Sequence, residues 1–298
     1  MITIYLHLCK LVKQLKMKVL RSILELKESL EINRLTLQDI GFVPTMGALH
    51  DGHISLINCA LKDNPLVIVS IFVNPEQFND NQDFIRYPRP ETDDLALLAG
   101  CLRDSDVVFI PDVNEIYPDR DNRIFDLGHL DRVMEGIHRP GHFNGVAKVV
   151  SILFTLVGKC NAYFGEKDFQ QLAVIRKLVS DYHFAVQIIA CPTIREQDGL
   201  AMSSRNRLLT AEYREKASAI PRALNWAQEM AGRLSCNDIK SGVWARIEEA
   251  GLIPEYVEIA DENNFQPVYD SSRNITLRIF VAVKAGNVRL IDNMKLFL

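Results

Sequence analysis

Two histidines three positions apart, His50 and His53, form the part of the chain best suited to phosphate chemistry. They lie where an apolar strand at residues 41–44 gives way to an amphipathic helix. The amino end of a helix offers N–H groups and the positive end of its dipole, and Gly47 and Gly52 let the backbone approach a ligand closely. Imidazole N–H groups add donors for phosphate oxygens. The stretch therefore predicts a nucleotide site.

The two histidines also have plainer interpretations, as exposed residues on a helix or as half of a metal site. A zinc site is disfavoured because no cysteine pair or third ligand stands nearby at metal spacing. The helix that follows is expected to bury Ile54, Ile57 and Leu61, which are three and four residues apart.

A second candidate stretch lies about 150 residues downstream, at residues 201–206 (AMSSRN). Its hydroxyls and its arginine can donate hydrogen bonds to a triphosphate and neutralise part of its charge. Taken alone, the stretch is better interpreted as a capping loop before a helix. Together with the histidine pair, it resembles the HIGH and KMSKS signatures of the superfamily that attacks the α-phosphate of ATP with a carboxylate or phosphate.

Further stretches narrow this resemblance to the pantothenate synthetase family, the AMP-forming pantoate–β-alanine ligases. The match covers the chain from about Gly41 to Asn293 in the order and spacing of that family, and residues 1–40 carry little of it. The matching stretches are 42–47 (FVPTMG), 70–78 (SIFVNPEQF), 139–146 (RPGHFNGV), 164–171 (FGEKDFQQ), 195–205 (REQDGLAMSSR) and 289–293 (RLIDN).

The resemblance implies ATP-dependent condensation of pantoate with β-alanine through a pantoyl adenylate, with AMP and pyrophosphate released and Mg²⁺ carried mainly by the ATP phosphates. His53 matches the proton donor of the family. We assign the other donors of the adenylation step to His50, Lys167, Ser203, Ser204 and Arg205. The implied ATP contacts are Met46, Gly47, Ala48, Leu49, His50, Asp51, Gly52, His53, Gly165, Glu166, Lys167, Asp168, Ile194, Met202, Ser203, Ser204 and Arg205.

An amide set is expected to bind the other substrates. The resemblance implies that Gln77 contacts both pantoate and β-alanine and that Gln171 binds pantoate, and Asn74 completes the set. Structural interpretations stand beside these roles. Asn74 and Gln77 follow a strand end, where amides commonly cap turns, and Asp168 and Gln171 have the spacing of a capping box. Capping leaves the helix amino end facing a ligand, so both interpretations can hold. Lys167 has the alternative of being an ordinary solvated lysine.

Strands and helices alternate through the first two thirds of the chain. This alternation predicts a Rossmann-like, doubly wound parallel sheet with ligands at the carboxyl ends of its strands. The expected strands are residues 66–73, 107–110, 162–164 and 185–190, and the expected helices are 147–157 and 168–182.

The pattern changes near residue 192. We expect a nucleotide- and pantoate-binding domain at 1–191 and a smaller α+β lid domain at 192–298 that carries the serine-rich stretch. The expected elements of the smaller domain are helices at 211–233 and 237–250 and strands at 256–259 and 277–283.

Composition agrees with an enzyme of this kind. The 298 residues are 48% hydrophobic and carry a net charge of −4, which argues against a nucleic-acid surface. No apolar run approaches the roughly 20 residues of a membrane span. Six scattered cysteines without CxxC pairs fit a cytoplasmic protein. Residues 1–21 hold five basic residues and no acid, and we favour Met17 as the start, with 1–16 as a non-native extension. A homodimer is implied by the resemblance alone.

Three other classes remain open. A simple adenylyltransferase shares the histidine motif but would lack the amide set. A small class I aminoacyl-tRNA synthetase would need length and basic surface for tRNA that the chain lacks. A regulatory nucleotide-binding module is weakened because every expected phosphate-contacting position is intact.

Overall fold

The computed structural model describes residues 17–34, 39–268 and 276–297, so the interpretation of residues 1–16 lies outside the described residues. The chain divides into two compact units. Unit 1 comprises the residues up to Asp131, Arg139–Gly165 and Gln171–Cys191. Unit 2 comprises Pro192–Leu298 and two short segments from earlier in the chain, Arg132–His138 and Glu166–Gln170.

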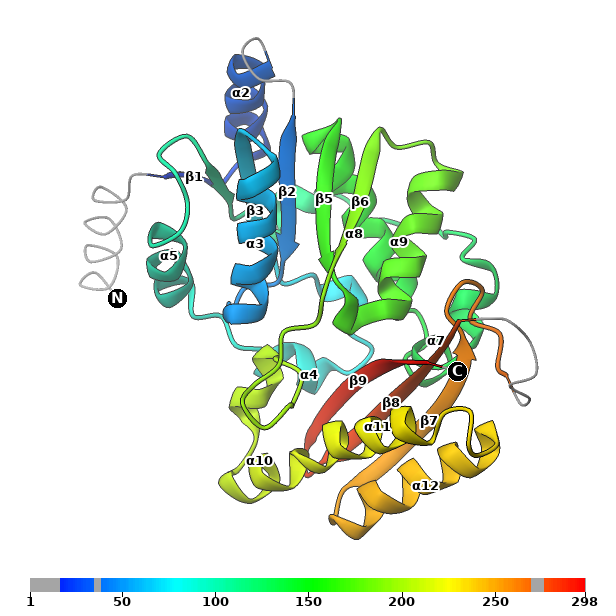
Figure 1. Ribbon diagram of the computed structural model, residues 1–298. Coiled ribbons are helices and arrows are strands. Elements are labelled where there is room, and N and C mark those ends of the chain that lie inside the picture. Colours follow the sequence, from blue (N-terminus) through cyan, green and yellow to red (C-terminus); the bar gives the residue numbers. More distant parts are fainter. Residues whose placement is uncertain (1–16, 35–38, 269–275, 298) are drawn as a thin grey trace. The chain divides into compact units, whose positions relative to one another are not determined.

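A six-stranded parallel sheet forms the centre of unit 1 and confirms the expected fold class (Figure 1). The strand order is β1-β4-β3-β2-β5-β6, so the order reverses between β2 and β5. Every residue of β3 is buried, as expected of a parallel strand covered on both faces. The strands are β1 (Lys18–Leu20), β2 (Ile40–Thr45), β3 (Leu66–Ile71), β4 (Val107–Phe109), β5 (Cys160–Gly165) and β6 (Val186–Cys191).

Helices flank this sheet (Figure 1). The α-helices are α2 (Ile23–Arg34), α3 (Asp51–Asp63), α4 (Asn81–Arg86), α5 (Glu91–Ala99), α6 (Val113–Ile116), α8 (His142–Val157) and α9 (Phe169–Asp181), and the 3₁₀ turns are η1 (Pro75–Gln77) and η2 (Gly128–Arg132). The first two residues of α9 belong to unit 2.

The buried face of α3 differs from the expected one. Leu56, Ile57 and Ala60 are buried, whereas Ile54 and Leu61 are only partly buried and pack at the margin of the core. The helix is turned so that the stripe through Leu56 faces the sheet, and only Ile57 was placed correctly.

Unit 2 is built on a three-stranded antiparallel sheet in the order β7-β8-β9. Its strands are β7 (Ile253–Asp261), β8 (Leu277–Ala285) and β9 (Val288–Leu296), and its helices and turns are α7 (Glu135–His138), η3 (Glu166–Asp168), η4 (Ser204–Leu208), α10 (Ala211–Ala217), α11 (Ala219–Met230) and α12 (Cys236–Glu249). The single helix expected at 211–233 is two helices separated at Ser218. Pro221 explains the break, because its ring would clash with the carbonyl of Ala217 in a continuous helix.

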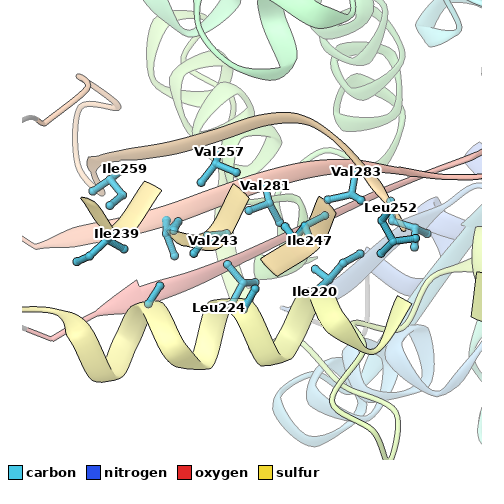
Figure 2. Close-up of a cluster of buried hydrophobic side chains, with 14 of the residues drawn as sticks. Ile220, Leu224, Ile239, Val243, Ile247, Leu252, Val257, Ile259, Val281 and Val283 are labelled. Carbon is cyan, nitrogen blue, oxygen red and sulfur yellow. The ribbon is translucent and has the colours of Figure 1, made fainter. Parts of the chain in front are cut away.

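An aliphatic core joins α11, α12 and the sheet of unit 2. Figure 2 shows Ile220 and Leu224 of α11 on one side of this core, with Val243 of α12 between them and the strands. Its labelled members are Ile220, Leu224, Ile239, Val243, Ile247, Leu252, Val257, Ile259, Val281 and Val283.

Two contacts explain why short earlier segments belong to unit 2. Phe169 packs with Phe265 and Phe280 at ring centroid distances of 5.8 and 6.2 Å. Arg289 donates to both carboxylate oxygens of Glu135 at 2.7 and 2.8 Å. Within the described ranges, no helix is long and apolar enough to cross a membrane.

Candidate active site

The loop from β2 into α3, residues 46–53, holds the two histidines in unit 1; we call it the histidine loop. Gly47 and Ala48 both have left-handed backbone conformations, with φ of 74° and 50°. A side chain at Gly47 would place its Cβ 2.9 Å from Asp94 and 3.0 Å from Ile71, so the tight packing as well as the φ angle requires glycine. The loop leaves the sheet where the strand order reverses, which is where ligands bind in open α/β sheets.

Asp94 of α5 fixes the backbone of the histidine loop through hydrogen bonds. Its carboxylate accepts hydrogen bonds from the backbone N–H groups of Ala48 at 2.8 Å and Leu49 at 2.7 Å. Asp94 is only 3% exposed. Asp94 was not among the residues predicted from the sequence, although it shares the buried face of its helix with Leu95 and Leu98. An acid at that position of an apolar stripe was the available signal.

His50 and His53 cap α3 reciprocally. Nδ1 of His50 accepts from the Gly52 N–H at 3.1 Å, and Nδ1 of His53 accepts from the His50 N–H at 3.3 Å. The rings lie 4.1 Å apart between centroids. A neutral imidazole whose Nδ1 accepts carries its proton on Nε2, so each ring has an Nε2–H to donate. The structural and the phosphate-binding interpretations are therefore compatible, because they use different ring nitrogens.

Asn74, Gln77 and Tyr117 form a second group in unit 1, which we call the amide cluster. Asn74 is the N-cap of η1 and donates to Gln77 Oε1 at 3.1 Å. The Tyr117 hydroxyl donates to Asn74 Oδ1 at 2.9 Å. Burial raises the pKa of Tyr117 well above its usual value, so the hydroxyl stays protonated and remains a donor. Gln77 Nε2 lies 2.9 Å from the Met46 sulfur, which links the amide cluster to the histidine loop.

The helix α8 supports the amide cluster. Asn74 also donates to the Gly145 carbonyl at 3.1 Å, and a Cβ on Gly145 would lie 2.1 Å from the Glu76 carbonyl oxygen. His142 Nδ1 lies 2.8 Å from the Gln77 carbonyl oxygen, and Arg139 Nη1 lies 3.1 Å from His142 Nε2. The stretch at 139–146 therefore lies directly against the amide cluster.

The remaining expected residues follow β5 and β6. Gly165 ends β5, and Gln171 lies half-buried on α9, both in unit 1. Glu166–Asp168 form η3 in unit 2. Lys167 Nζ lies 3.7 Å from the Asp168 carboxylate, and its side chain is largely buried. Lys167 is thus not the solvated lysine of the plainer interpretation.

Residues 202–205, the serine loop, lie in unit 2 before α10. The Met202 N–H donates to the Ile194 carbonyl at 3.0 Å, which places these two residues side by side. Ser203 is the N-cap of η4 and accepts from the Arg205 N–H at 3.3 Å, and Ser204 is buried. The serine loop therefore caps η4, whereas the helix expected after it, α10, has Thr210 as its own N-cap.

The expected site residues therefore form groups in each unit. In unit 1 the structure brings Met46–His53 together with the amide cluster. In unit 2 it brings Ile194 together with the serine loop, and η3 lies against β9. Glu76 of η1 is exposed, and its carboxylate forms an ion pair with Lys148 at 2.8 Å.

Comparison with known proteins gives a consistent result. The family model for pantoate-beta-alanine ligase matches residues 18–295. A pantothenate synthetase from Bacteroides fragilis is 45% identical over 280 residues, covering 94% of this chain and 99% of that protein. Another, from Porphyromonas gingivalis, is 46% identical over 285 residues, again covering 94% and 99%.

Solved structures agree. The pantothenate synthetase of Thermus thermophilus superposes with a TM-score of 0.86 at 39% identity, covering 95% of this chain and 100% of that one. The pantoate-beta-alanine ligase of Francisella tularensis, complexed with beta-gamma ATP and beta-alanine, gives a TM-score of 0.79 at 39% identity and covers 94% and 97%.

Proposed function

The chain belongs to the pantoate–β-alanine ligase family and forms pantothenate from pantoate and β-alanine, and on that premise we propose that ATP activates the pantoate carboxylate as an acyl adenylate. The ATP-type ligand and β-alanine in the Francisella tularensis complex support ATP as the activating substrate. The single observation that carries the site assignment is the reciprocal capping of α3 by His50 and His53, which makes Nδ1 of each ring an acceptor and places the proton of each neutral ring on Nε2.

Activation is needed because oxide is a poor leaving group from a carboxylate. In the first half-reaction a carboxylate oxygen of pantoate attacks the α-phosphorus of ATP, the bond to the bridging oxygen breaks, and pyrophosphate leaves. In the second, the amine of β-alanine attacks the acyl carbon, AMP leaves with the bridging oxygen, and the amine loses a proton. The first transition state concentrates negative charge on the oxygens around the α-phosphorus and on the departing pyrophosphate.

Donors fixed before the reaction lower this barrier most effectively. We assign His50 and His53 to the phosphate oxygens through their Nε2–H groups, with His53 as the proton donor. Lys167, Ser203, Ser204 and Arg205 supply the donors and positive charge of unit 2. The remaining ATP contacts are assigned to Met46, Gly47, Ala48, Leu49, Asp51, Gly52, Gly165, Glu166, Asp168, Ile194 and Met202.

The amide cluster is assigned to the other substrates. Gln77 contacts pantoate and β-alanine, Asn74 orients Gln77, and Gln171 binds pantoate. A simple adenylyltransferase, which binds neither pantoate nor β-alanine, has no use for this arrangement. The hydrogen bonds that fix the Gln77 amide support the ligase assignment at the level of individual residues.

We propose that ATP reacts with Mg²⁺ bound to its phosphates. Mg²⁺ prefers oxygen ligands and neutralises phosphate charge when bound. Within the described residues, no group of three or more histidine, cysteine, aspartate and glutamate side chains is arranged to hold a metal ion.

We also propose a homodimer in the cytoplasm. The family likeness supports the dimer, and light scattering after size-exclusion chromatography measures it directly. None of the five cysteines in the described part of the chain forms a disulfide, which supports a reducing compartment.

Pyrophosphate exchange tests the adenylate route. The protein should incorporate labelled pyrophosphate into ATP when pantoate is present and β-alanine is absent. If exchange required both pantoate and β-alanine, the two half-reactions would be concerted and the adenylate assignment would be wrong. Leaving out pantoate is the control, and it should abolish the exchange.

A further inference from the structure

The stretch at 289–293 lies on β9 in unit 2 and takes no part in the contacts assigned to substrates. Asn293 is 4% exposed, and its side-chain Nδ2 donates to two backbone carbonyls of η3, those of Glu166 at 3.0 Å and Lys167 at 2.9 Å. One amide thus fixes two consecutive peptide groups of the turn that carries Lys167.

The preceding residue holds a different segment. Asp292 accepts from two guanidinium nitrogens of Arg195, at 2.7 and 3.0 Å. Arg195 also donates to the Gly199 carbonyl at 3.0 Å and is bridged through its backbone to Ala201. Asp292 therefore holds the turn at 194–202, which leads directly into the serine loop. Successive side chains of a strand point in opposite directions, so neighbours can hold two different segments.

Arg278 of β8 fixes the orientation of the Asn293 amide. Its Nη1 donates to Asn293 Oδ1 at 2.6 Å, and its guanidinium carbon lies 3.8 Å from the centre of the Phe169 ring. Because the oxygen of the amide faces Arg278, the nitrogen faces the carbonyls of η3. An aspartate at this position would face those carbonyls with an acceptor and leave them without donors.

We propose that Asp292 and Asn293 are positioning residues that hold η3 and the 194–205 segment in one fixed geometry for binding the ATP phosphates. The inference rests on the proposed function, which assigns Lys167 and the serine loop to ATP. Each segment alone supplies few phosphate contacts. Because β9 holds both η3 and the 194–205 segment in place beforehand, nucleotide binding does not have to supply the free energy of ordering them.

Two near-isosteric variants test the proposal. Asn293→Asp removes the donor of the carbonyls, and Asp292→Asn removes the charge that holds Arg195. Each should weaken binding of α,β-methylene-ATP and raise the KM for ATP by about ten- to a hundredfold, as expected for lost buried hydrogen bonds. Pantoate affinity should change by less than about twofold, because the amide cluster is untouched. Hydrogen exchange at 166–168 and 202–205 should become faster, and ATP should restore less protection than in the wild type.

Asp261→Asn is the matched control. Asp261 is a buried carboxylate at the end of β7 that accepts from the Asn263 N–H at 2.9 Å, within the turn that follows that strand. The control should lower thermal stability while leaving the ATP KM unchanged. If Asn293→Asp does not fold, Asp292→Asn carries the test alone, because it keeps the volume and one acceptor of the native side chain.

Two outcomes separate the inference from the proposed function. If Lys167→Ala weakens α,β-methylene-ATP binding but neither strand variant does so beyond Asp261→Asn, the positioning role is wrong and the ATP site stands. If Lys167→Ala also leaves binding unchanged, the assignment of ATP to this segment is wrong.

Discussion

Asn74 donates a hydrogen bond from its side-chain nitrogen to Oε1 of Gln77 over 3.1 Å, and this bond determines which way the Gln77 amide faces. Tyr117 fixes the donor in turn by donating to Asn74 Oδ1 at 2.9 Å. Gln77 is left with its Nε2 directed at the Met46 sulfur, 2.9 Å away. A thioether is a weak acceptor, so a hydroxyl or carboxylate of a substrate would be a better partner for this nitrogen.

Replacing the substrate amides should raise the pantoate requirement selectively. Gln77→Ala and Gln171→Ala each remove a hydrogen bond to a polar substrate group, which costs about 1–3 kcal/mol, or roughly one to two decades in pantoate KM. The ATP KM should change much less. Steady-state kinetics with each substrate varied in turn measures both values, and equal effects on the two would contradict the assignment.

Tyr117→Phe should weaken pantoate binding indirectly, because Tyr117 orients Asn74 and Gln77 but is not assigned a contact with pantoate. Loss of the hydroxyl leaves Asn74 Oδ1 with one donor fewer, so the orientation of the Gln77 amide is less well fixed. We expect a several-fold rise in pantoate KM at constant ATP KM. Tyr163→Phe is the control, since Tyr163 is buried and its hydroxyl accepts from Asn64 at 2.8 Å, at the end of α3. It should cost stability only.

The histidines require variants that keep the helix cap. His50→Asn retains an N-cap acceptor, and His53→Gln retains the reciprocal acceptor of a capping box. Both should preserve thermal stability and slow formation of pantoyl adenylate by about 10²–10³, the usual cost of losing one preorganised donor. Amide formation from supplied pantoyl adenylate should be spared, because pyrophosphate has already left.

Rapid-quench measurement of each half-reaction separates these effects. Equal slowing of both half-reactions, together with a fall in melting temperature, would mean that the rings serve only to cap α3. His50→Ala and His53→Ala provide the comparison, because they lose the cap and the donor together.

Asp94→Asn should impair ATP use through the histidine loop. The carboxylate accepts two backbone N–H groups, and an amide can accept them only at the cost of turning its own N–H₂ toward a donor. We expect the ATP KM to rise about tenfold, as for one lost buried hydrogen bond. Asp106→Asn is the control: Asp106 is fully buried and accepts from Val67 and Arg103 N–H groups at 2.9 and 2.7 Å, at the amino end of the strands. It should lower the urea midpoint without changing the ATP KM.

The sequence predicted the parallel sheet well because β-branched runs such as 66–71 are buried on both faces and have one reasonable interpretation. It did not predict β9, in which Asp292 and Asn293 are both buried and interrupt the alternation of a strand. Those two residues are polar because they hold other segments of the chain. A strand prediction based on alternating hydrophobic residues therefore fails at Asp292 and Asn293, the two positions of β9 that hold other segments of unit 2.

The same limit applies to the candidate site. Its residues were predicted from their resemblance to family motifs, and their contacts with substrates stay a prediction. Asp94 and Tyr117 were missed because their partners lie 45 and 43 residues away in the sequence. The acid on the buried stripe of α5 marked Asp94 as unusual, but only the folded chain shows which distant loop it supports.

Unit 2 is assembled from segments that are far apart in the sequence, which affects when it can fold during synthesis. The ribosome delivers Glu135 and Phe169 long before Arg289 and Phe280, with which they pair. Until β8 and β9 have been synthesised, Glu135 lacks its partner Arg289 and Phe169 lacks its partner Phe280. A chain cut at residue 191 would leave the guanidinium of Arg289 without the Glu135 carboxylate. Because unit 2 is built from three separate stretches of sequence, it cannot be transferred between genes as one contiguous segment.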